Sequence, residues 1–180
     1  MEPLASKIRP KNLEEFVGQE HLVGENRPLN VAIKQKHLFS FVLWGPPGTG
    51  KTTLAKIYAN SLDAKLYELS AVSAGKADIK KLLEEDSLGV PKVLFLDEIH
   101  RFNKSQQDFL LPYVERGEIT LIGATTENPS FEVIPALLSR CRVFVLNELS
   151  EDNKKAIIKR IGLKMDKEAE DWLINMANGD

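Results

Sequence analysis

The chain has 180 residues, of which 43% are hydrophobic and 28% are charged, and its formal net charge is −2. This composition is typical of a globular protein and excludes the disordered and coiled-coil classes. The single cysteine excludes an internal disulfide framework, and no apolar run reaches the roughly 20 residues that a membrane helix requires. A soluble, cytoplasmic protein is therefore expected.

Short apolar runs alternate with helical patterns along the first 150 residues. The runs predicted as strands are Phe39–Trp44, Lys65–Leu69, Val93–Leu96, Ile119–Gly123 and Val143–Leu146. The helical patterns between them are Thr52–Leu62, Lys76–Glu85, Lys104–Glu115 and Ile134–Ser139. Short runs of this kind are typical of strands covered on both faces. Their alternation with helices predicts an α/β fold with a five-stranded parallel sheet flanked by helices.

The pattern changes after Leu149. Ser150 suits a helix N-cap and Gly162 suits the end of that helix, while Asp166 suits the N-cap of a second helix. Two helices without a following strand predict a core over residues 1–149 and the start of a small helical lid over residues 150–180. The second helix is expected to turn four residues inward, namely Ala169, Trp172, Leu173 and Met176.

A phosphate-loop motif follows the first predicted strand and opens a helix. Its residues are Gly45, Pro46, Pro47, Gly48, Thr49, Gly50, Lys51 and Thr52, a full match to G-x-x-x-x-G-K-[ST]. Glycines let backbone N–H groups approach phosphate oxygens, and the helix N-terminus adds a favourable potential. Lys51 supplies positive charge for the β- and γ-phosphates, and Thr52 supplies a hydroxyl ligand for Mg²⁺. The motif predicts a nucleotide site that uses Mg²⁺.

Two adjacent carboxylates end the third predicted strand, at Asp97 and Glu98. Side chains alternate along a strand, so neighbouring acids at its end can serve different tasks. We expect Asp97 to hold Mg²⁺ and Glu98 to polarise an attacking water. Two acids at a solvated strand end are the simpler alternative, but their pairing with the phosphate loop favours hydrolysis.

Together these residues resemble the AAA+ ATPases, and in particular their clamp-loader-like group. Ser139-Arg140-Cys141 is similar to the Ser-Arg-Cys motif of sliding-clamp loaders. Residues 8–10 and 16–20 resemble the N-terminal segment, here residues 1–38, that these proteins fold beside adenine. Residues 97–108 and 123–131 are similar to members that act in replication and recombination.

The resemblance implies roles for individual residues. Arg140 would be an arginine finger that reaches the γ-phosphate of a neighbouring subunit, although an arginine at a helix end can equally pair with a carboxylate, and Arg142 competes for the role. Thr126 or Asn128 would sense the γ-phosphate, with Thr125 a further alternative. Beyond the phosphate loop itself, the residues expected around ATP are Arg9, Pro10, Val17, Gly18 and Thr53.

The resemblance also implies a DNA-dependent ATPase of replication, recombination and repair. It would act as a nucleoid-associated homo-oligomer at forks, DNA ends or single-strand gaps, alongside partners such as single-strand binding protein. The candidate DNA contacts are Lys76, Lys80 and Lys81, which follow the second strand. Lys80 and Lys81 beside Glu84–Glu85 are equally typical of a solvent-exposed helix face with charge pairs four residues apart.

Other functions stay open at this stage. A Holliday-junction or clamp-loader motor subunit and a nucleotide-gated scaffold that does not hydrolyse ATP are both compatible with the motifs. A small-molecule kinase also uses a phosphate loop, but Asp97-Glu98 and Ser139-Arg140-Cys141 argue against it. Gly179-Asp180 resembles the pair that precedes a lid arginine, so the 180 residues are expected to be the N-terminal part of a longer protein and weakly active or inactive alone.

Overall fold

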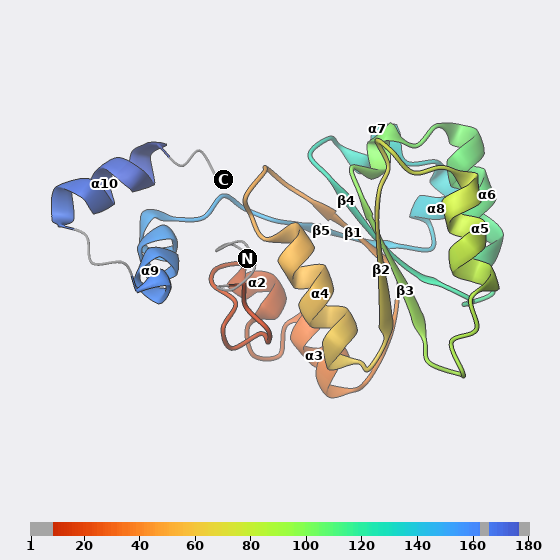
Figure 1. The fold of residues 1–180 in the computed structure, drawn as a ribbon, viewed down its shortest axis with the longest axis horizontal. Helices are drawn as coiled ribbons and strands as arrows, with labels where there is room; N and C mark the ends of the chain where they lie inside the picture. Colours follow the sequence, from red (N-terminus) through yellow and green to blue (C-terminus); the bar gives the residue numbers. More distant parts are fainter. Residues whose placement is uncertain (1–8, 163–165, 177–180) are drawn as a thin grey trace.

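The computed structural model describes residues 9–162 and 166–176. Five parallel strands form one sheet in the order β2-β3-β4-β1-β5, which confirms the predicted fold (Figure 1). Because all strands are parallel, their carboxyl ends share one edge of the sheet. The strands are β1 (Phe41–Trp44), β2 (Lys65–Ser70), β3 (Lys92–Asp97), β4 (Thr120–Thr125) and β5 (Arg142–Val145).

Helices cover both faces of the sheet. One face carries α2 (Glu20–Val23), α3 (Pro28–Lys34) and α4 (Lys51–Ser61). The other face carries α5 (Lys76–Glu84), α6 (Lys104–Glu115) and α8 (Pro135–Leu138). Two short elements, η1 (Ile99–Arg101) and α7 (Pro129–Glu132), follow β3 and β4 respectively.

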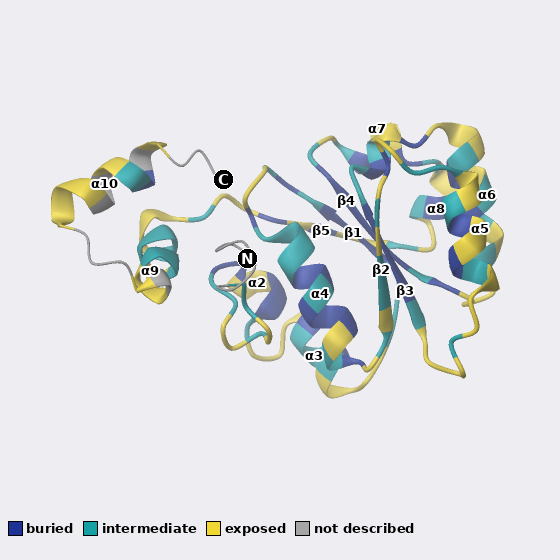
Figure 2. Ribbon diagram, viewed as in Figure 1, coloured by how far each residue is buried: buried dark blue, intermediate teal, exposed yellow. Residues whose placement is uncertain are grey.

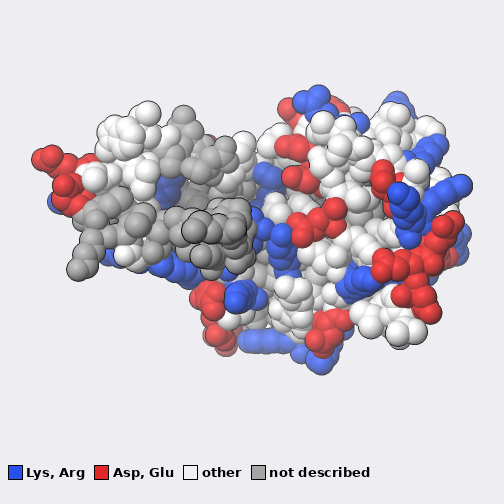
Figure 3. All heavy atoms as spheres, in the orientation of Figure 1, with Lys and Arg blue, Asp and Glu red and all other residues white. Residues whose placement is uncertain are grey.

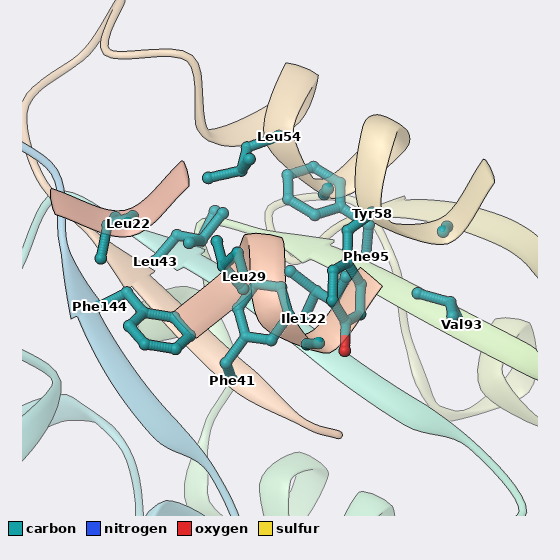
Figure 4. Packing of buried hydrophobic residues seen from close by; sticks show 14 of the residues in the cluster. Leu22, Leu29, Phe41, Leu43, Leu54, Tyr58, Val93, Phe95, Ile122 and Phe144 are labelled. Atoms are coloured by element: carbon teal, nitrogen blue, oxygen red, sulfur yellow. The ribbon is translucent and has the colours of Figure 1, made fainter. Parts of the chain in front are cut away.

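The central strands β3 and β4 consist almost entirely of buried residues (Figure 2). Along β3, Val93 and Phe95 join the core beneath α4, whereas Leu94 and Leu96 join the core beneath α5 and α6. The aromatic rings of Phe41 and Tyr58 meet edge to face at 5.0 Å in the first of these cores (Figure 4). Two cores of this kind hold the carboxyl edge of the sheet rigid, and that edge carries the phosphate loop.

The first of the two helices expected after Leu149 is present. Helix α9 (Glu151–Ile161) starts at Ser150, whose Oγ accepts a hydrogen bond from the Asn153 N–H at 3.2 Å, and Gly162 ends it with φ +71°. Helix α10 (Lys167–Met176) follows Asp166, whose Oδ1 accepts from the Ala169 N–H at 2.8 Å. Both N-cap predictions are confirmed.

The predicted inward face of α10 is wrong for most of its members. Trp172 and Met176 are each 63% exposed and Ala169 is exposed, whereas Ile174 is buried. The described part of the lid is one helix pair, which offers α10 only a narrow surface to pack on. Gly179-Asp180 lies outside the described residues. Within residues 9–162 and 166–176, no helix has the length and apolar character needed to span a bilayer.

Candidate nucleotide site

The phosphate loop joins β1 to α4 at the carboxyl edge of the sheet. Gly48 and Gly50 have φ of +69° and +94°, in the left-handed region where a side chain is strained. A Cβ on Gly50 would also lie 2.8 Å from the Phe16 ring, and one on Gly45 would lie 2.4 Å from the Leu146 carbonyl oxygen. The glycines are therefore required by local geometry. The Thr49 hydroxyl donates to the Pro46 carbonyl at 2.9 Å and braces the loop.

Gly50→Ala is expected to weaken nucleotide binding by about tenfold or more, because it adds roughly 1–2 kcal/mol of backbone strain and displaces Phe16 from the loop. Titration with a fluorescent ATP analogue measures the effect. Gly117→Ala is the matched control, since Gly117 also has a left-handed φ (+69°) but open space around it. Both variants should lose stability, and only Gly50→Ala should lose affinity. Equal affinity in the two variants would contradict a role for this loop.

Lys51 is held inside the loop. Its Nζ donates to the Gly45 and Pro46 carbonyl oxygens at 2.8 Å and 2.7 Å. Burial lowers the pKa of Lys51, while the charges of Glu98 and Asp97 oppose that shift. The ammonium group and the two carboxylates therefore share one electrostatic environment. The structure brings together the charged residues that the two motifs predicted.

Asp97 ends β3, and Glu98 follows it with a left-handed backbone, φ +53° and ψ +47°. The Asp97 Oδ1 accepts a hydrogen bond from the Glu98 N–H at 3.1 Å. Because of this turn, Glu98 does not continue the strand that ends at Asp97. The hydroxyl of Thr52 in the first turn of α4 and the carboxylate of Asp97 are the oxygen donors that Mg²⁺ prefers, so these residues fit a magnesium ion.

Thr125 is fully buried at the end of β4, next to β1 in the sheet. Its Oγ1 lies 2.9 Å from His100 Nδ1, and His100 Nδ1 lies 3.2 Å from Glu98 Oε2. Thr126 is half-buried in the following turn, and the Asn128 side chain caps α7 by accepting from the Ser130 N–H at 3.0 Å. The sensor assignment to Thr126 or Asn128 stays a prediction. A role for His100 was not predicted, because the only sequence observation on the histidines is that they share no metal-ligand spacing.

A cavity of about 240 Å³ adjoins the phosphate loop on the side of the N-terminal segment and the lid. Its predicted members are Arg9, Pro10, Val17, Gly48, Thr49, Gly50 and Thr53. Four further lining residues were not among those expected around ATP: Phe16, Leu149, Ile157 and Arg160. Gly18 is buried, and a Cβ there would lie 2.8 Å from Leu149. Residues of the N-terminal segment and of α9 thus line one space beside the loop, where we place adenine as a prediction.

Gln19 ties this cavity together and was not among the predicted site residues. Its buried amide donates to the Asn147 carbonyl at 2.7 Å and accepts from the Asn147 N–H at 2.9 Å. The same amide reaches the Thr49 carbonyl at 3.5 Å. One side chain therefore links the N-terminal segment, the phosphate loop and the segment between β5 and α9.

Arg140 lies at the other end of the strands from the phosphate loop, near the amino ends of β1 and β4. It lines a groove of about 480 Å³ with Ser40 and Thr120, which stand at the amino ends of β1 and β4. Its guanidinium contacts Glu115 at 2.8 Å and donates to the Ser139 hydroxyl at 2.6 Å. Since the phosphate loop follows the carboxyl end of β1, Arg140 is remote from the phosphates of its own subunit. The sequence left open whether Arg140 pairs with a carboxylate, and in the structure it pairs with Glu115.

The neighbours of Arg140 have other tasks. The Arg142 guanidinium lies 4.9 Å from the centre of the Phe39 ring, a cation–π contact with the sheet. Burial raises the pKa of the Cys141 thiol to about 12, so this cysteine is not a reactive thiolate at neutral pH. The Arg142 guanidinium thus packs on Phe39, whereas Arg140 lines the groove.

The model of the AAA family, the ATPase family associated with various cellular activities, matches residues 41–149. The chain belongs to this family. Replication-associated recombination protein A of Coxiella burnetii is 55% identical over 159 residues, which cover 87% of this chain and 36% of that protein. The Escherichia coli K12 protein of the same name is 50% identical over 161 residues, with the same two shares. The predicted resemblance is confirmed, and the chain is a homologue of these proteins that spans about a third of their length.

Two more proteins are similar to this chain. The ATPase WRNIP1 of Dictyostelium discoideum is 45% identical over 192 residues, which cover 99% of this chain and 22% of that protein. The Thermotoga maritima RuvB Holliday junction branch migration motor has a TM-score of 0.76 at 32% identity, covering 96% of this chain and 61% of that one. The likeness to this structure therefore extends beyond residues 41–149, which the family model matches.

Proposed function

We propose that the protein hydrolyses ATP as a subunit of a homo-oligomeric AAA machine that acts on DNA during replication, recombination and repair. The observation that carries this proposal is the meeting of Lys51, Asp97 and Glu98 at one edge of the sheet, with Arg140 exposed at the other. A site split in this way is complete only where two subunits meet head to tail. DNA is the proposed substrate because relatives of this chain are named for replication and recombination.

Each residue then has a distinct task. Lys51 leaves its loop carbonyls and neutralises the β- and γ-phosphate oxygens, and Thr52 and Asp97 hold Mg²⁺. When bound, Mg²⁺ draws charge from the phosphate oxygens. Glu98 accepts a proton from the attacking water. Arg140 of the adjacent subunit places its guanidinium against the charge that spreads over the transferred phosphoryl group.

Phosphate release by the full-length protein, with ATP and no acceptor, tests this function directly. We expect turnover that rises when forks, gapped duplexes or DNA ends are added. A kinase would transfer the phosphoryl group to an acceptor and release no free phosphate in its absence, and a scaffold would bind ATP without hydrolysing it. Absence of phosphate release under all DNA conditions would refute the proposal.

A Holliday-junction motor is the second candidate, favoured by the likeness to the RuvB structure. The same assay separates the two if a four-way junction is included. Stimulation by the junction alone, with none by forks or gaps, would assign the protein to junction migration. Stimulation by forks and gaps would assign it to the replication-associated role.

The candidate DNA contacts lie on α5 and differ in their surroundings. Lys76 Nζ donates to the Ser105 hydroxyl at 2.8 Å and lies 5.8 Å from the centre of the Phe109 ring. Lys80 and Lys81 are exposed. Figure 3 shows basic and acidic side chains interspersed over the part of the molecule that carries α5 and α6, so a broad single-sign field does not mark this face. DNA contact here would rest on a few lysines repeated around an oligomer.

Reversing the charge of Lys76, Lys80 and Lys81 is expected to weaken DNA binding by about tenfold or more and to reduce its salt dependence, because each lost phosphate contact lowers the slope by about one. Fluorescence anisotropy across a salt series measures both quantities. The control reverses Arg27, Lys34 and Lys36, three exposed cations at and beside α3 on the other face. Equal losses in the two triple variants would contradict a specific contact on α5.

A further inference from the structure

The imidazole of His100 lies between two parts of the nucleotide site. His100 sits on η1, directly after Asp97 and Glu98, and its side chain is only 11% exposed. Its Nδ1 is 2.9 Å from Thr125 Oγ1 on β4 and 3.2 Å from Glu98 Oε2. One ring nitrogen therefore reaches both the candidate general base and the carboxyl tip of the neighbouring strand.

The surroundings of this nitrogen decide where the imidazole proton lies. The Thr125 hydroxyl accepts from the Glu127 N–H at 2.9 Å and donates to the Glu127 carbonyl at 3.2 Å. With its single proton directed to the Glu127 carbonyl, the hydroxyl has a lone pair left to accept a hydrogen bond from His100. An unprotonated Nδ1 would also place its lone pair 3.2 Å from the Glu98 carboxylate. Both neighbours therefore favour a proton on Nδ1.

The Glu98 carboxylate lacks a partner where it needs one. Its Oε2 is buried and receives no hydrogen bond from any residue that the structure describes, although His100 Nδ1 is close by. With its proton on Nδ1, the imidazole donates to Thr125 Oγ1 at 2.9 Å instead. Burying a carboxylate oxygen without a hydrogen-bond donor costs free energy. A small movement that frees the Nδ1–H from Thr125 would therefore let the same N–H donate to Glu98 Oε2.

We propose that His100 is a positioning residue whose single Nδ1–H is shared between Thr125 and Glu98, so that it couples the tip of β4 to the orientation of the Glu98 carboxylate. This inference rests on the proposed function, in which Glu98 activates water. While Thr125 holds the proton, the carboxylate is free to turn away from the phosphates. When the tip of β4 moves, the imidazole binds Oε2 and fixes the carboxylate toward the water.

Two substitutions of His100 in the full-length protein separate the N–H donor from the ring volume. His100→Asn places an amide nitrogen near the position of Nδ1, whereas His100→Leu fills the space without a donor. We expect His100→Leu to lower kcat for ATP hydrolysis by about 10- to 100-fold, because the base is misoriented, with the Kd for ATP changed less than about twofold. His100→Asn should recover most of the loss.

A double-mutant cycle tests the coupling to β4. Thr125→Val removes the hydroxyl with little change in volume, and its effect on kcat should largely vanish once His100 is already Leu. Wild-type kcat in His100→Leu would overturn the inference, and so would equal losses in the Leu and Asn variants or strictly additive effects in the cycle. A wild-type protein without any turnover would refute the proposed function instead.

The position of the proton gives a readout that does not depend on activity. Solid-state ¹⁵N spectra of the full-length protein labelled at histidine distinguish a protonated Nδ1 from a bare one, and His100→Asn identifies the signal by its loss. We expect Nδ1 of His100 to be protonated in the nucleotide-free protein. A bare Nδ1 would overturn the inference even if hydrolysis is observed.

Discussion

Replacing Glu98 by Gln is expected to slow ATP hydrolysis by about 10²–10⁴-fold while ATP still binds, because an amide has the same shape as the carboxylate but cannot accept a proton. Glu98 shares an electrostatic environment with Lys51 at the phosphate loop, and its buried Oε2 is free to receive a hydrogen bond. Single-turnover phosphate release from the full-length protein measures the rate, and a fluorescent ATP analogue measures binding.

Two controls make this result specific to catalysis. Glu25→Gln changes an exposed carboxylate in the loop between α2 and α3, and it should leave turnover unchanged. Full turnover in Glu98→Gln would show that another group activates the water. Joint loss of binding and hydrolysis would mean that Glu98 supports the loop instead of the chemistry.

Replacing Arg140 by Ala should lower turnover by about 10³-fold or more, the range in which arginine fingers act in phosphoryl transfer. Arg140 lines a groove at the amino ends of β1 and β4, so its effect must be exerted on a neighbouring subunit. ATP binding by each subunit should persist, because the phosphate loop of the same chain is untouched. Steady-state turnover and ATP binding of the full-length protein give the two numbers.

The existing partner of Arg140 does not prevent this role. Arg140 and Glu115 are 46% and 40% exposed at their side chains, and such surface ion pairs contribute only about 0–1 kcal/mol. The phosphates of an adjacent subunit can therefore compete for the guanidinium. Arg142→Ala is the discriminating variant, because Arg142 stacks on Phe39. Loss of turnover in Arg142→Ala with normal turnover in Arg140→Ala would move the role to Arg142.

The parts of the fold that sequence predicted are those with a local physical signature. Buried strands appear as short apolar runs, and α6 spans Lys104–Glu115 as predicted, since Asn103 and Gln106 form a capping box at its start. The phosphate loop follows from its glycines, and Asp97 from its place at the end of a strand. In each case, neighbouring residues carry the whole signal.

The unpredicted features depend on contacts between distant parts of the chain. His100 meets Thr125 only because β3 and β4 pair in parallel, and Gln19 meets Asn147 only because the N-terminal segment folds against the end of β5. Helices as short as α2 and α7 contain too few residues to show a period. The exposure of Trp172 reflects what surrounds α10, which an amphipathic pattern does not specify.

The central claim is that one ATPase site is built from two subunits, and mixing two inactive full-length variants tests it most directly. In a mixed ring, an Arg140→Ala subunit keeps Glu98 and can receive Arg140 from a Glu98→Gln neighbour. An equimolar mixture should therefore recover about one quarter of the wild-type rate, as random head-to-tail pairing predicts. A mixture that assembles but hydrolyses ATP no faster than either variant alone would contradict a shared site.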